Sequence, residues 1–427
     1  MKNPTLAKGS AWTISNCPLK TIIPTGKRAI KDGVKFLTAL VGLLVTGLVA
    51  NGLAAELTYP IVATGQEQCY DNFHAIAAPQ PGQPFYGQDA QHPGHAPAYR
   101  DNGDGTIFDL VTGLMWVQTR GEKMSWADAV AGARTCRVGG YTDWRLPTIK
   151  ELYSLIQFTG ECMGETGSRP FLDTNYFRFA YGDPARGERM IDCQDWSATE
   201  YVGTTMNGNA TVFGVNFADG RIKGYPKFDP RTRNPHELFV RYVRGNPAYG
   251  KNDFHDNADG TVSDRATGLM WSKADGRAPM NWQQALAWVQ QLNATNYLGH
   301  ADWRLPNAKE LQSLLDYSRV PAIAPVFEIS RLSDGEYPFY WSSTTHLDGP
   351  PGHRGGAAVY VCFGRGLGWM QFPPGWGDFR LMDVHGAGAQ RSDPKVGNPA
   401  MFPHGRGPQG DVIRIYNFVR CVRDSDK

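Results

Sequence analysis

Residues 143–147 read Asp-Trp-Arg-Leu-Pro, and residues 302–306 read the same five amino acids. Two further blocks upstream recur in the same order. They are an Asp-rich block, Asp101-Asn-Gly-Asp-Gly-Thr106 and Asp256-Asn-Ala-Asp-Gly-Thr261, and an apolar block, Thr112-Gly-Leu-Met-Trp116 and Thr267-Gly-Leu-Met-Trp271. The chain therefore contains two homologous repeats, each long enough to form a domain. We place the first repeat at 99–245 and the second at 246–427.

The Asp-Trp-Arg-Leu-Pro blocks predict a structural corner rather than a catalytic triad. Proline disfavours helical backbone in the residue before it. A helix is expected directly after each block, because Thr148 and Asn307 are each followed three residues later by a glutamate, the pattern of a capping box. We expect the arginine of each block to pair with a nearby carboxylate and the tryptophan to fill the core.

An earlier helix in each repeat is expected to begin at Ser125 and at Asn281. Apolar residues recur at helical spacing after these starts and are expected to be buried: Trp126, Val130 and Ala133, and Trp282, Leu286 and Val289. The Asp-rich blocks predict hairpin turns rather than calcium loops, because aspartate occupies positions 1 and 4 instead of 1, 3 and 5. Strands are expected to close each repeat, so the predicted fold class is α+β.

The order of these blocks, with a closing Val-Arg-Cys-Val-Arg at 419–423, resembles the Lcl C-terminal domain family over residues 99–245 and 254–423. That family is named for a domain of a bacterial surface adhesin associated with sulfated glycosaminoglycans and cell attachment. More distantly, the pattern resembles the C-type lectins. This resemblance implies two tandem C-type-lectin-like modules, each with two helices and a small twisted antiparallel sheet. The calcium and sugar motifs of lectins, and the cysteine pair of the related formylglycine-generating enzymes, are missing from the sequence.

Residues 1–55 have the pattern of a signal peptide. A basic stretch precedes the uncharged, largely apolar run Phe36–Ala55, which ends in small residues. An uncleaved membrane anchor is the alternative, and translation from Val34 would leave a signal peptide of ordinary length. A cleaved signal peptide and an uncleaved anchor both predict export. We therefore expect a secreted, periplasmic or cell-surface protein that contacts the membrane only through its export signal. Residues 56–98 form a Pro- and Gly-rich N-terminal segment.

The charge of the chain gives no indication of a nucleic-acid partner. Without residues 1–55 the chain has 36 Lys and Arg and 40 Asp and Glu, a formal net charge of −4. Nucleic-acid binding usually requires clustered basic residues. The composition, with 41% hydrophobic and 20% charged residues, is that of an ordinary globular protein.

Six cysteines follow the leader, an even number that predicts disulfides in an exported chain. The three expected bonds are Cys362–Cys421, Cys162–Cys193 and Cys69–Cys136. The first joins cysteines found only in the second repeat, where the first repeat has Asn216 and Tyr242. The second closes a loop that only the first repeat has, and the third pairs the cysteines that are left. No cysteines have the short spacing of a zinc site, so neither a metal nor a cofactor is expected.

The second repeat has a Gly- and Pro-rich excursion, residues 364–410, that the first repeat lacks. Long loops in compact domains are usually functional or disordered. Its aromatic and basic residues suit an anionic polysaccharide or another glycan, because rings stack on sugar faces and guanidinium groups chelate sulfate or carboxylate. The residues expected to bind are Trp369, Trp376, His385, Arg391, Lys395 and Arg406.

The sequence therefore predicts an exported, non-enzymatic binding or adhesion protein that recognises a polysaccharide or another surface polymer through its second repeat. The main alternative is a structural subunit of an extracellular or cell-surface assembly, formed with itself or with other surface proteins. In that case the excursion folds back to cover a sheet edge or to contact the first repeat, or it makes an assembly contact. Catalysis is least favoured, because His385 and Asp393 offer hydrolase residue types without a recognised arrangement.

Overall fold

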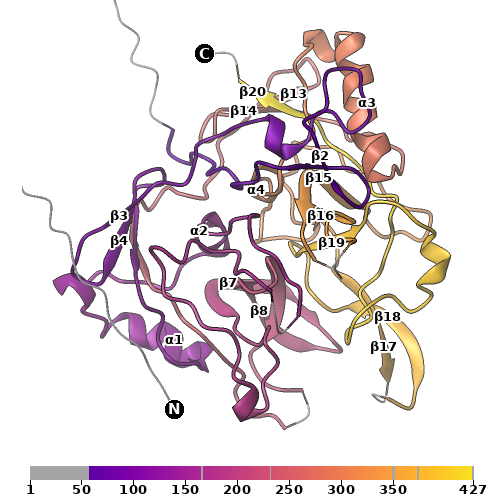
Figure 1. Cartoon of the computed structure of the whole chain (residues 1–427). Coiled ribbons are helices and arrows are strands. Elements are labelled where there is room, and N and C mark those ends of the chain that lie inside the picture. The colour runs from indigo at the N-terminus through magenta and orange to yellow at the C-terminus, as the bar shows by residue number, and fades with distance from the viewer. Residues whose placement is uncertain (1–56, 165–166, 231, 349–351, 373–374, 426–427) are drawn as a thin grey trace, which may run out of the picture. The chain divides into compact units, whose positions relative to one another are not determined.

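The computed structural model describes residues 57–425, apart from 165–166, 231, 349–351 and 373–374. Of the described residues, 31% are in β structure and 13% in helices, and their strands form six sheets. The predicted fold class is therefore wrong, because the described part is mainly β structure in six sheets and does not have the C-type-lectin-like arrangement of two helices and one small sheet per module. The α+β description fits only loosely, since the described helices are short and the largest sheet belongs to both repeats (Figure 1).

The first repeat begins with three strands that its closing strand completes into a four-stranded sheet, in the order β11-β5-β4-β3. The Asp-rich block forms the turn between β3 and β4, where Asp104 Oδ1 accepts hydrogen bonds from the backbone and hydroxyl of Thr106 at 3.0 and 2.6 Å. The elements of the N-terminal segment are β1 (Cys69–Tyr70), β2 (Ala75–Ile76) and the 3-10 helix η1 (Asp89–Gln91). Those of the first repeat are β3 (Tyr99–Asp101), β4 (Thr106–Asp109), β5 (Leu114–Val117), β6 (Met124–Ser125), α1 (Trp126–Ala133), η2 (Val138–Gly140), α2 (Ile149–Ser154), η3 (Pro184–Arg186), β7 (Asp195–Thr205), β8 (Asn209–Asn216), β9 (Arg221–Pro226), β10 (Glu237–Leu238) and β11 (Val243–Gly245).

The second repeat reproduces this arrangement in the sheet β12-β13-β14-β20. Its Asp-rich turn has the same bonds, with Asp259 Oδ1 accepting from the backbone and hydroxyl of Thr261 at 2.9 and 2.6 Å. Its elements are β12 (Phe254–Asp256), β13 (Thr261–Asp264), β14 (Leu269–Ser272), α3 (Trp282–Ala294), η4 (Tyr297–Gly299), α4 (Ala308–Ser313), β15 (Phe339–His346), β16 (Ala357–Cys362), β17 (Leu367–Phe372), β18 (Asp378–Asp383), β19 (Gln390–Pro394), η5 (Pro399–Met401) and β20 (Val422–Asp424).

The α-helices begin where the capping residues predict. The side chains of Ser125, Thr148, Asn281 and Asn307 each accept a hydrogen bond from the backbone N–H three residues on. The last three are full capping boxes, in which the side chain of that third residue also bonds to the backbone of the cap. The predicted helix starts are confirmed.

Each Asp-Trp-Arg-Leu-Pro block forms a corner between the two helices of its repeat, and its arginine pairs with the capping-box glutamate. Arg145 binds both carboxylate oxygens of Glu151 at 2.5 and 2.6 Å, and Arg304 binds Glu310 at 2.5 Å. The tryptophans of both blocks are buried. The predicted pairing and the predicted burial are both confirmed.

The two repeats are joined by a six-stranded sheet in the order β15-β16-β19-β9-β8-β7. The repeats meet where Gln390 of β19 pairs with Ile222 of β9. Strands β15 and β16 of the second repeat stand in mirrored order to β7 and β8 of the first, so β7 and β15 form the two edges of the sheet. Because β19 belongs to the excursion, part of that excursion is buried structure that joins the repeats.

Helices α2 and α4 also join the repeats, through two equivalent lysines. Lys150 Nζ donates to the backbone carbonyl of Ser313 at 2.8 Å, and Lys309 Nζ donates to that of Ser154 at 2.8 Å. Burial lowers the pKa of Lys150 to about 8 and that of Lys309 to about 7. The contact is therefore reciprocal, with each repeat donating to the other.

The N-terminal segment, described from residue 57, packs on the second repeat. The Gln66 side chain bonds both the backbone N–H and the carbonyl of Thr345 on edge strand β15, at 2.9 and 2.8 Å. The Phe85 ring lies 6.3 Å from the Trp282 ring of α3, between centroids. Figure 1 shows this segment in indigo beside α3 and β15, so the second repeat has a cover that comes from outside the repeat.

The six cysteines of the described part are free thiols, so none of the three predicted disulfides is present. Cys362 and Cys421 are kept apart by β15, since Phe339 pairs with Cys362 on one side and accepts a hydrogen bond from the Phe418 N–H on the other. Residues separated by an intervening strand are about 9–10 Å apart, which is beyond the reach of a disulfide. The predicted Cys362–Cys421 bond is therefore wrong.

The other two predicted pairs are also unbonded. Cys69 lies in β1 of the N-terminal segment, whereas Cys136 packs against a hydrophobic cluster of the first repeat. Burial raises the pKa of the Cys162 and Cys193 thiols to about 12. Thiolate, the reactive form, is therefore scarce at both cysteines near neutral pH.

Within the described ranges, no helix has the length and apolar character needed to cross a bilayer. The predicted signal peptide, residues 1–55, lies outside the described residues and stays a prediction.

Candidate functional site

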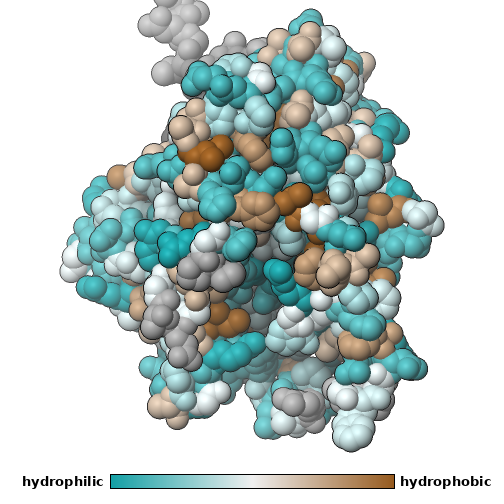
Figure 2. Space-filling model, turned by 45° about the vertical axis from the view of Figure 1, so that its right-hand side comes forward, coloured by the Kyte–Doolittle hydropathy of each residue, from teal (hydrophilic) through white to brown (hydrophobic). Residues whose placement is uncertain are grey.

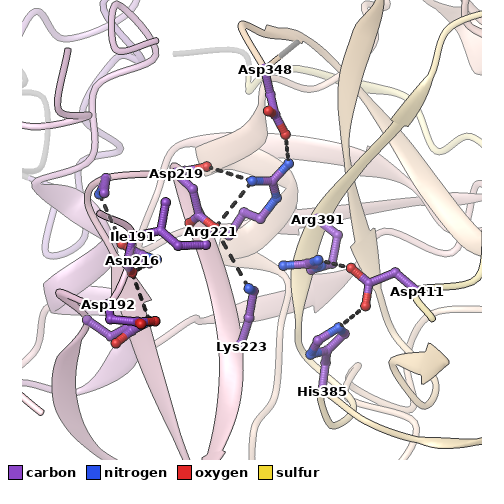
Figure 3. A network of polar contacts seen from close by, with 12 residues as sticks. Ile191, Asp192, Asn216, Asp219, Arg221, Lys223, Asp348, His385, Arg391 and Asp411 are labelled. Atoms are coloured by element: carbon purple, nitrogen blue, oxygen red, sulfur yellow. Dashed lines mark hydrogen bonds and ion pairs between the residues drawn. The ribbon is translucent and has the colours of Figure 1, made fainter. Parts of the chain in front are cut away.

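A cleft of about 690 Å³ opens where the two repeats meet. One wall comes from the first repeat, mainly from β9 and residues 188–194. The other wall comes from β19 and residues 406–411 of the second repeat. Figure 3 shows a network of charged side chains that reaches across from one wall to the other. We call this cavity the inter-repeat cleft.

Arg221 on β9 links the two walls. Its guanidinium lies 3.3 Å from Asp219 Oδ2, donates to Ser392 Oγ at 3.0 Å, and pairs with Asp348, which follows β15. Burial lowers the pKa of Arg221, but the carboxylates of Asp348 and Asp219 outweigh burial and raise it above its ordinary value. Burial raises the pKa of Asp348, and Arg221 outweighs that effect and holds it well below its usual range. Both groups are therefore charged near neutral pH.

Lys223 lies two residues further along β9. Its Nζ is 3.7 Å from Asp219 Oδ2, and 15% of its side chain is exposed. Burial and the charge of Arg391 lower the pKa of Lys223 to about 7, although Asp219 opposes this shift. Lys223 is therefore present in both charged and neutral forms near neutral pH.

On the opposite wall, Asp411 holds His385 and Arg391. Asp411 Oδ1 is 2.6 Å from His385 Nε2, and its other oxygen pairs with Arg391. Burial, with the charge of Arg391, lowers the pKa of His385 well below its ordinary value. The imidazole is therefore neutral, and we assign the ring hydrogen to Nε2, which donates it to Asp411. Among the described residues, Nε and Nη1 of Arg391 and Nδ1 of His385 have no hydrogen-bond partner.

The cleft is lined by charges of both signs. Six lysines and arginines and eight aspartates and glutamates contribute to its surface. Since the basic groups of the network are already paired with carboxylates, the cleft does not build up a positive potential. It offers hydrogen-bond donors and acceptors side by side, a pattern that matches hydroxyl groups better than it matches a polyanion.

Three of the six residues predicted to bind a ligand are buried in structural contacts. His385 and Arg391 belong to the network of the cleft, and Lys395 is 0% exposed. Lys395 Nζ donates to the carbonyl of Asp71 at 2.9 Å and to Thr345 Oγ1 at 2.8 Å. Lys395 thus holds the N-terminal segment on the second repeat and is not accessible to a ligand.

The other three predicted residues reach the surface. Trp376 lies in the turn between β17 and β18 and is 93% exposed, and Trp369 on β17 is half-buried. Arg406 is exposed, and its guanidinium lies 5.3 Å from the centroid of the Phe402 ring. Arg406 also lines the inter-repeat cleft.

Strands β17 and β18 present a row of apolar side chains beside this arginine. Trp369 lies opposite Leu381, and Gln371 lies opposite Phe379, so these residues share one face of the hairpin. His404 stacks on Phe379 with the ring centroids 3.7 Å apart. Phe379 and Leu381 are 39% and 37% exposed. We call Trp369, Phe379, Leu381 and His404 the aromatic face.

On the side of the molecule that Figure 2 presents, hydrophobic residues form small, separate patches among hydrophilic ones. Permanent protein interfaces are marked by broader apolar patches. On this side, apolar side chains are therefore available to a ligand singly, among polar groups, and do not form one continuous apolar surface.

Within the network that links the two walls of the cleft, sequence reasoning missed five charged residues: Asp219, Arg221, Lys223, Asp348 and Asp411. A weak local signal exists at 219–223, where charged residues alternate with Gly220 and Ile222 as in a strand with one polar face. The aspartates at 348 and 411 have no local pattern of this kind. They join the network because the fold brings Asp348 to Arg221 on β9 and Asp411 to Arg391 on β19.

The family model described as the Lcl C-terminal domain matches residues 105–244 and 260–371, together more than half of the chain. The second match ends within β17, so β18, β19 and the segment with Arg406 lie outside the matched ranges. No curated protein and no solved structure matches the chain significantly.

Proposed function

We propose that this chain, which belongs to the Lcl C-terminal domain family, is a binding protein without catalytic activity that holds a polysaccharide on its second repeat. The observation that carries the proposal is the aromatic face of the β17–β18 hairpin, with Trp376 exposed in the turn of the same hairpin. Arg406 follows His404 of this face by two residues and lines the inter-repeat cleft, so the two surfaces adjoin.

The chemistry of these two surfaces suits a sugar chain. Sugar rings have apolar faces, which pack against aromatic rings such as Phe379 and Trp376. Their hydroxyl groups both donate and accept hydrogen bonds, as do the paired basic and acidic groups of the cleft. The balance of charges in the cleft favours a neutral or weakly charged polysaccharide over a strongly sulfated one.

Export is part of the proposal and rests on the pattern of residues 1–55. Four of the six described free thiols are compatible with it, because Cys69, Cys193, Cys362 and Cys421 are almost completely buried and shielded from oxidants, whereas Cys136 and Cys162 are half-buried. Fractionation of the native, untagged protein tests this part. Recovery in the cytoplasm alone would contradict it.

A glycan array followed by titration of the best ligand tests the binding site. Trp376→Ala and Phe379→Ala are each expected to weaken binding by about tenfold, because exposed aromatic anchors dominate such contacts. Leu110→Ala is the matched control, since Leu110 is 54% exposed on the first repeat, and it should leave the affinity unchanged. For a neutral sugar, the affinity should change less than about twofold between about 0.05 and 0.5 M salt.

The three parts of the proposal fail separately. Unchanged binding by the variant with both aromatic substitutions would reject the site. Binding confined to sulfated glycans and abolished by salt would reject the ligand class. Cleavage of the bound glycan by the purified chain would reject the non-enzymatic role.

A further inference from the structure

The two repeats contain the same groove, and only one of the two is covered. A cavity of about 970 Å³ is lined in the first repeat by Val130 and Ala133 of α1, by Arg134 directly after it, and by Trp144, Arg145 and Leu146 of the corner. The cavity continues along residues 247–252 to residues 254 and 314–317 of the second repeat. The six equivalent residues of the second repeat line a cavity of only about 420 Å³. That smaller cavity is shared with Tyr86, Gly87 and His92 of the N-terminal segment. We call the two cavities the open groove and the covered groove.

The covered groove is filled by a piece of the chain itself, in which residues 81–87 fold into turns and the 3-10 helix η1 follows. Gly82 N–H donates to the Gln290 side chain on α3 at 2.8 Å, and Phe85 packs on Trp282. Four residues after Phe85, Asp89 accepts a hydrogen bond from the hydroxyl of Thr344 at 2.5 Å. The covering segment therefore supplies an aromatic ring and, four residues later, a carboxylate.

The same difference holds at the edges of the six-stranded sheet. On β15 the Gln66 side chain satisfies the backbone of Thr345, as described above. On the opposite edge, β7 has Glu200 at the equivalent position, and Glu200 and Val202 are exposed, Val202 by 55%. Trp196 and Ala198 of β7 already donate to the carbonyls of Phe239 and Pro147, so the part of this edge open to a further chain lies around Glu200 and Val202.

Burial shows how far the two grooves differ at equivalent positions. Leu286, Ser343 and Thr344 of the covered groove are each no more than 1% exposed. Their counterparts in the first repeat are Val130, which is 37% exposed, Ala198, which is exposed, and Thr199, which is half-buried. The open groove thus lacks the cover that its twin has.

The open groove also retains the group that binds the carboxylate. Thr199 Oγ1 accepts a hydrogen bond from the Ile149 N–H at 3.0 Å, just as Thr344 Oγ1 accepts one from Ala308 at 2.9 Å. The Thr199 hydroxyl hydrogen is therefore free to donate to an incoming carboxylate, as that of Thr344 does to Asp89. Four basic residues line the open groove, Arg134, Arg145, Lys150 and Lys251, against the two acidic residues Glu151 and Asp316.

We propose that the open groove is a docking site for a short segment of a partner protein, one that carries an aromatic side chain followed four residues later by a carboxylate. The covered groove shows the mode of binding, with the aromatic ring against the first helix and the carboxylate on the threonine. The excess of basic residues in the open groove selects an acidic segment. This surface is distinct from the aromatic face on the second repeat.

A labelled synthetic peptide with the sequence of residues 79–95 supplies this chemistry, and its binding to the full chain is measured by fluorescence anisotropy. Saturable binding is expected. It should be lost with Ala198→Trp, which fills the open groove, and with Val130→Glu, which opposes the carboxylate. Leu110→Trp, on an exposed turn outside the groove, is the control. A peptide with Asp89→Asn should bind about tenfold more weakly.

Several results would overturn the proposal. One is the absence of saturable binding to the wild-type chain. Another is binding that survives both groove substitutions, since the peptide would then be displacing the chain's own segment from the covered groove. A third is a wild-type dimer in light scattering that Ala198→Trp dissociates, because the occupant would then be a second copy. Circular dichroism of each variant separates loss of the groove from loss of the fold.

Discussion

The two repeats have closely similar buried contacts, but their surfaces are covered differently. Arg241 in the first and Arg420 in the second are buried, and each donates to three backbone carbonyls of its own repeat. Outside, the N-terminal segment covers α3 and β15 of the second repeat, while their counterparts α1 and β7 lack that cover. The comparison teaches that the repeat determines where a side chain is placed, whereas a neighbouring segment determines whether it is exposed.

The largest expected effect concerns the two lysines that join the repeats. The unfolded chain keeps each lysine proton up to about pH 10.5, whereas burial makes the folded chain release it near pH 8 for Lys150 and near pH 7 for Lys309. Raising the pH from 7 to 10 should therefore stabilise the fold, by about 3 kcal/mol for Lys150 and somewhat more for Lys309. Lys150→Met and Lys309→Met should each remove the part of this rise in the free energy of unfolding with pH that comes from the substituted lysine. Urea unfolding at several pH values measures the rise.

Lys251→Met, at an exposed position in the open groove, is the control for these lysine variants. Its pH profile should follow that of the wild type. If the two buried-lysine variants also kept the wild-type slope, the reciprocal contact between the repeats would not be the source of the pH dependence.

The buried arginines should show the equivalence of the two repeats most directly. Arg241→Met and Arg420→Met each leave three buried carbonyls without their donor, which should lower the free energy of unfolding by about 3–5 kcal/mol. Denaturant unfolding should give nearly equal losses for the two variants. Arg186→Met, at a side chain that is 72% exposed, should cost almost nothing. A loss in one repeat only would break the comparison.

The cover of the second repeat should respond to acid through Asp89. Burial raises the pKa of Asp89 to about 6, although its hydrogen bonds from Thr344 and Thr64 oppose the shift. Because the folded chain binds this proton more tightly than the unfolded chain does, stability from Asp89 is fully present below about pH 4 and is lost as the pH rises through about 6, by about 3 kcal/mol. Asp89→Asn should remove this dependence, whereas Asp378→Asn, at an exposed position, should keep it.

The smallest expected effect lies in the two corner ion pairs. The side chain of Arg304 is 12% exposed and also bonds Asp424, whereas that of Arg145 is 36% exposed. Water screens the more exposed pair, so Arg145→Met should cost about 1 kcal/mol or less and Arg304→Met about 2 kcal/mol. Thermal unfolding of the two variants side by side measures the difference. Equal losses would show that the unequal exposure of the pairs has no energetic consequence.

Local patterns predicted local structure well. The capping residues located the helix starts because each cap bonds a backbone group only three residues away. Helical periodicity was less reliable for burial, since it predicted that Val130 and Leu286 are both buried, yet Val130 is 37% and Leu286 1% exposed. Both residues point to the same side of equivalent helices, and only the second helix lies under the N-terminal segment.

Sequence patterns gave wrong predictions where the outcome depends on strands far apart in the chain. The joint presence of Cys362 and Cys421 in one repeat predicted a disulfide, but β15 runs between them. The excursion was predicted either to bind a ligand or to fold back over a sheet edge or onto the first repeat; β19 does the second, since it pairs with both repeats, and Lys395 after it is fully buried. Of the six residues predicted to bind a ligand, Trp376 and Arg406 are exposed and Trp369 is half-buried.

The sequence by itself determined the family, the two repeats, the helix starts and the pairing of each corner arginine with its glutamate. These features depend on residues close together in the chain, so the spacing of those residues can be read from the sequence. The tertiary structure alone decided that the repeats share one sheet, that charged residues of both meet in the inter-repeat cleft, and that one groove is covered while its twin is open. Such contacts join residues more than a hundred positions apart, as Arg221 joins Asp348. They form because burying the apolar faces of both repeats together stabilises the fold, and no spacing within either repeat records that outcome.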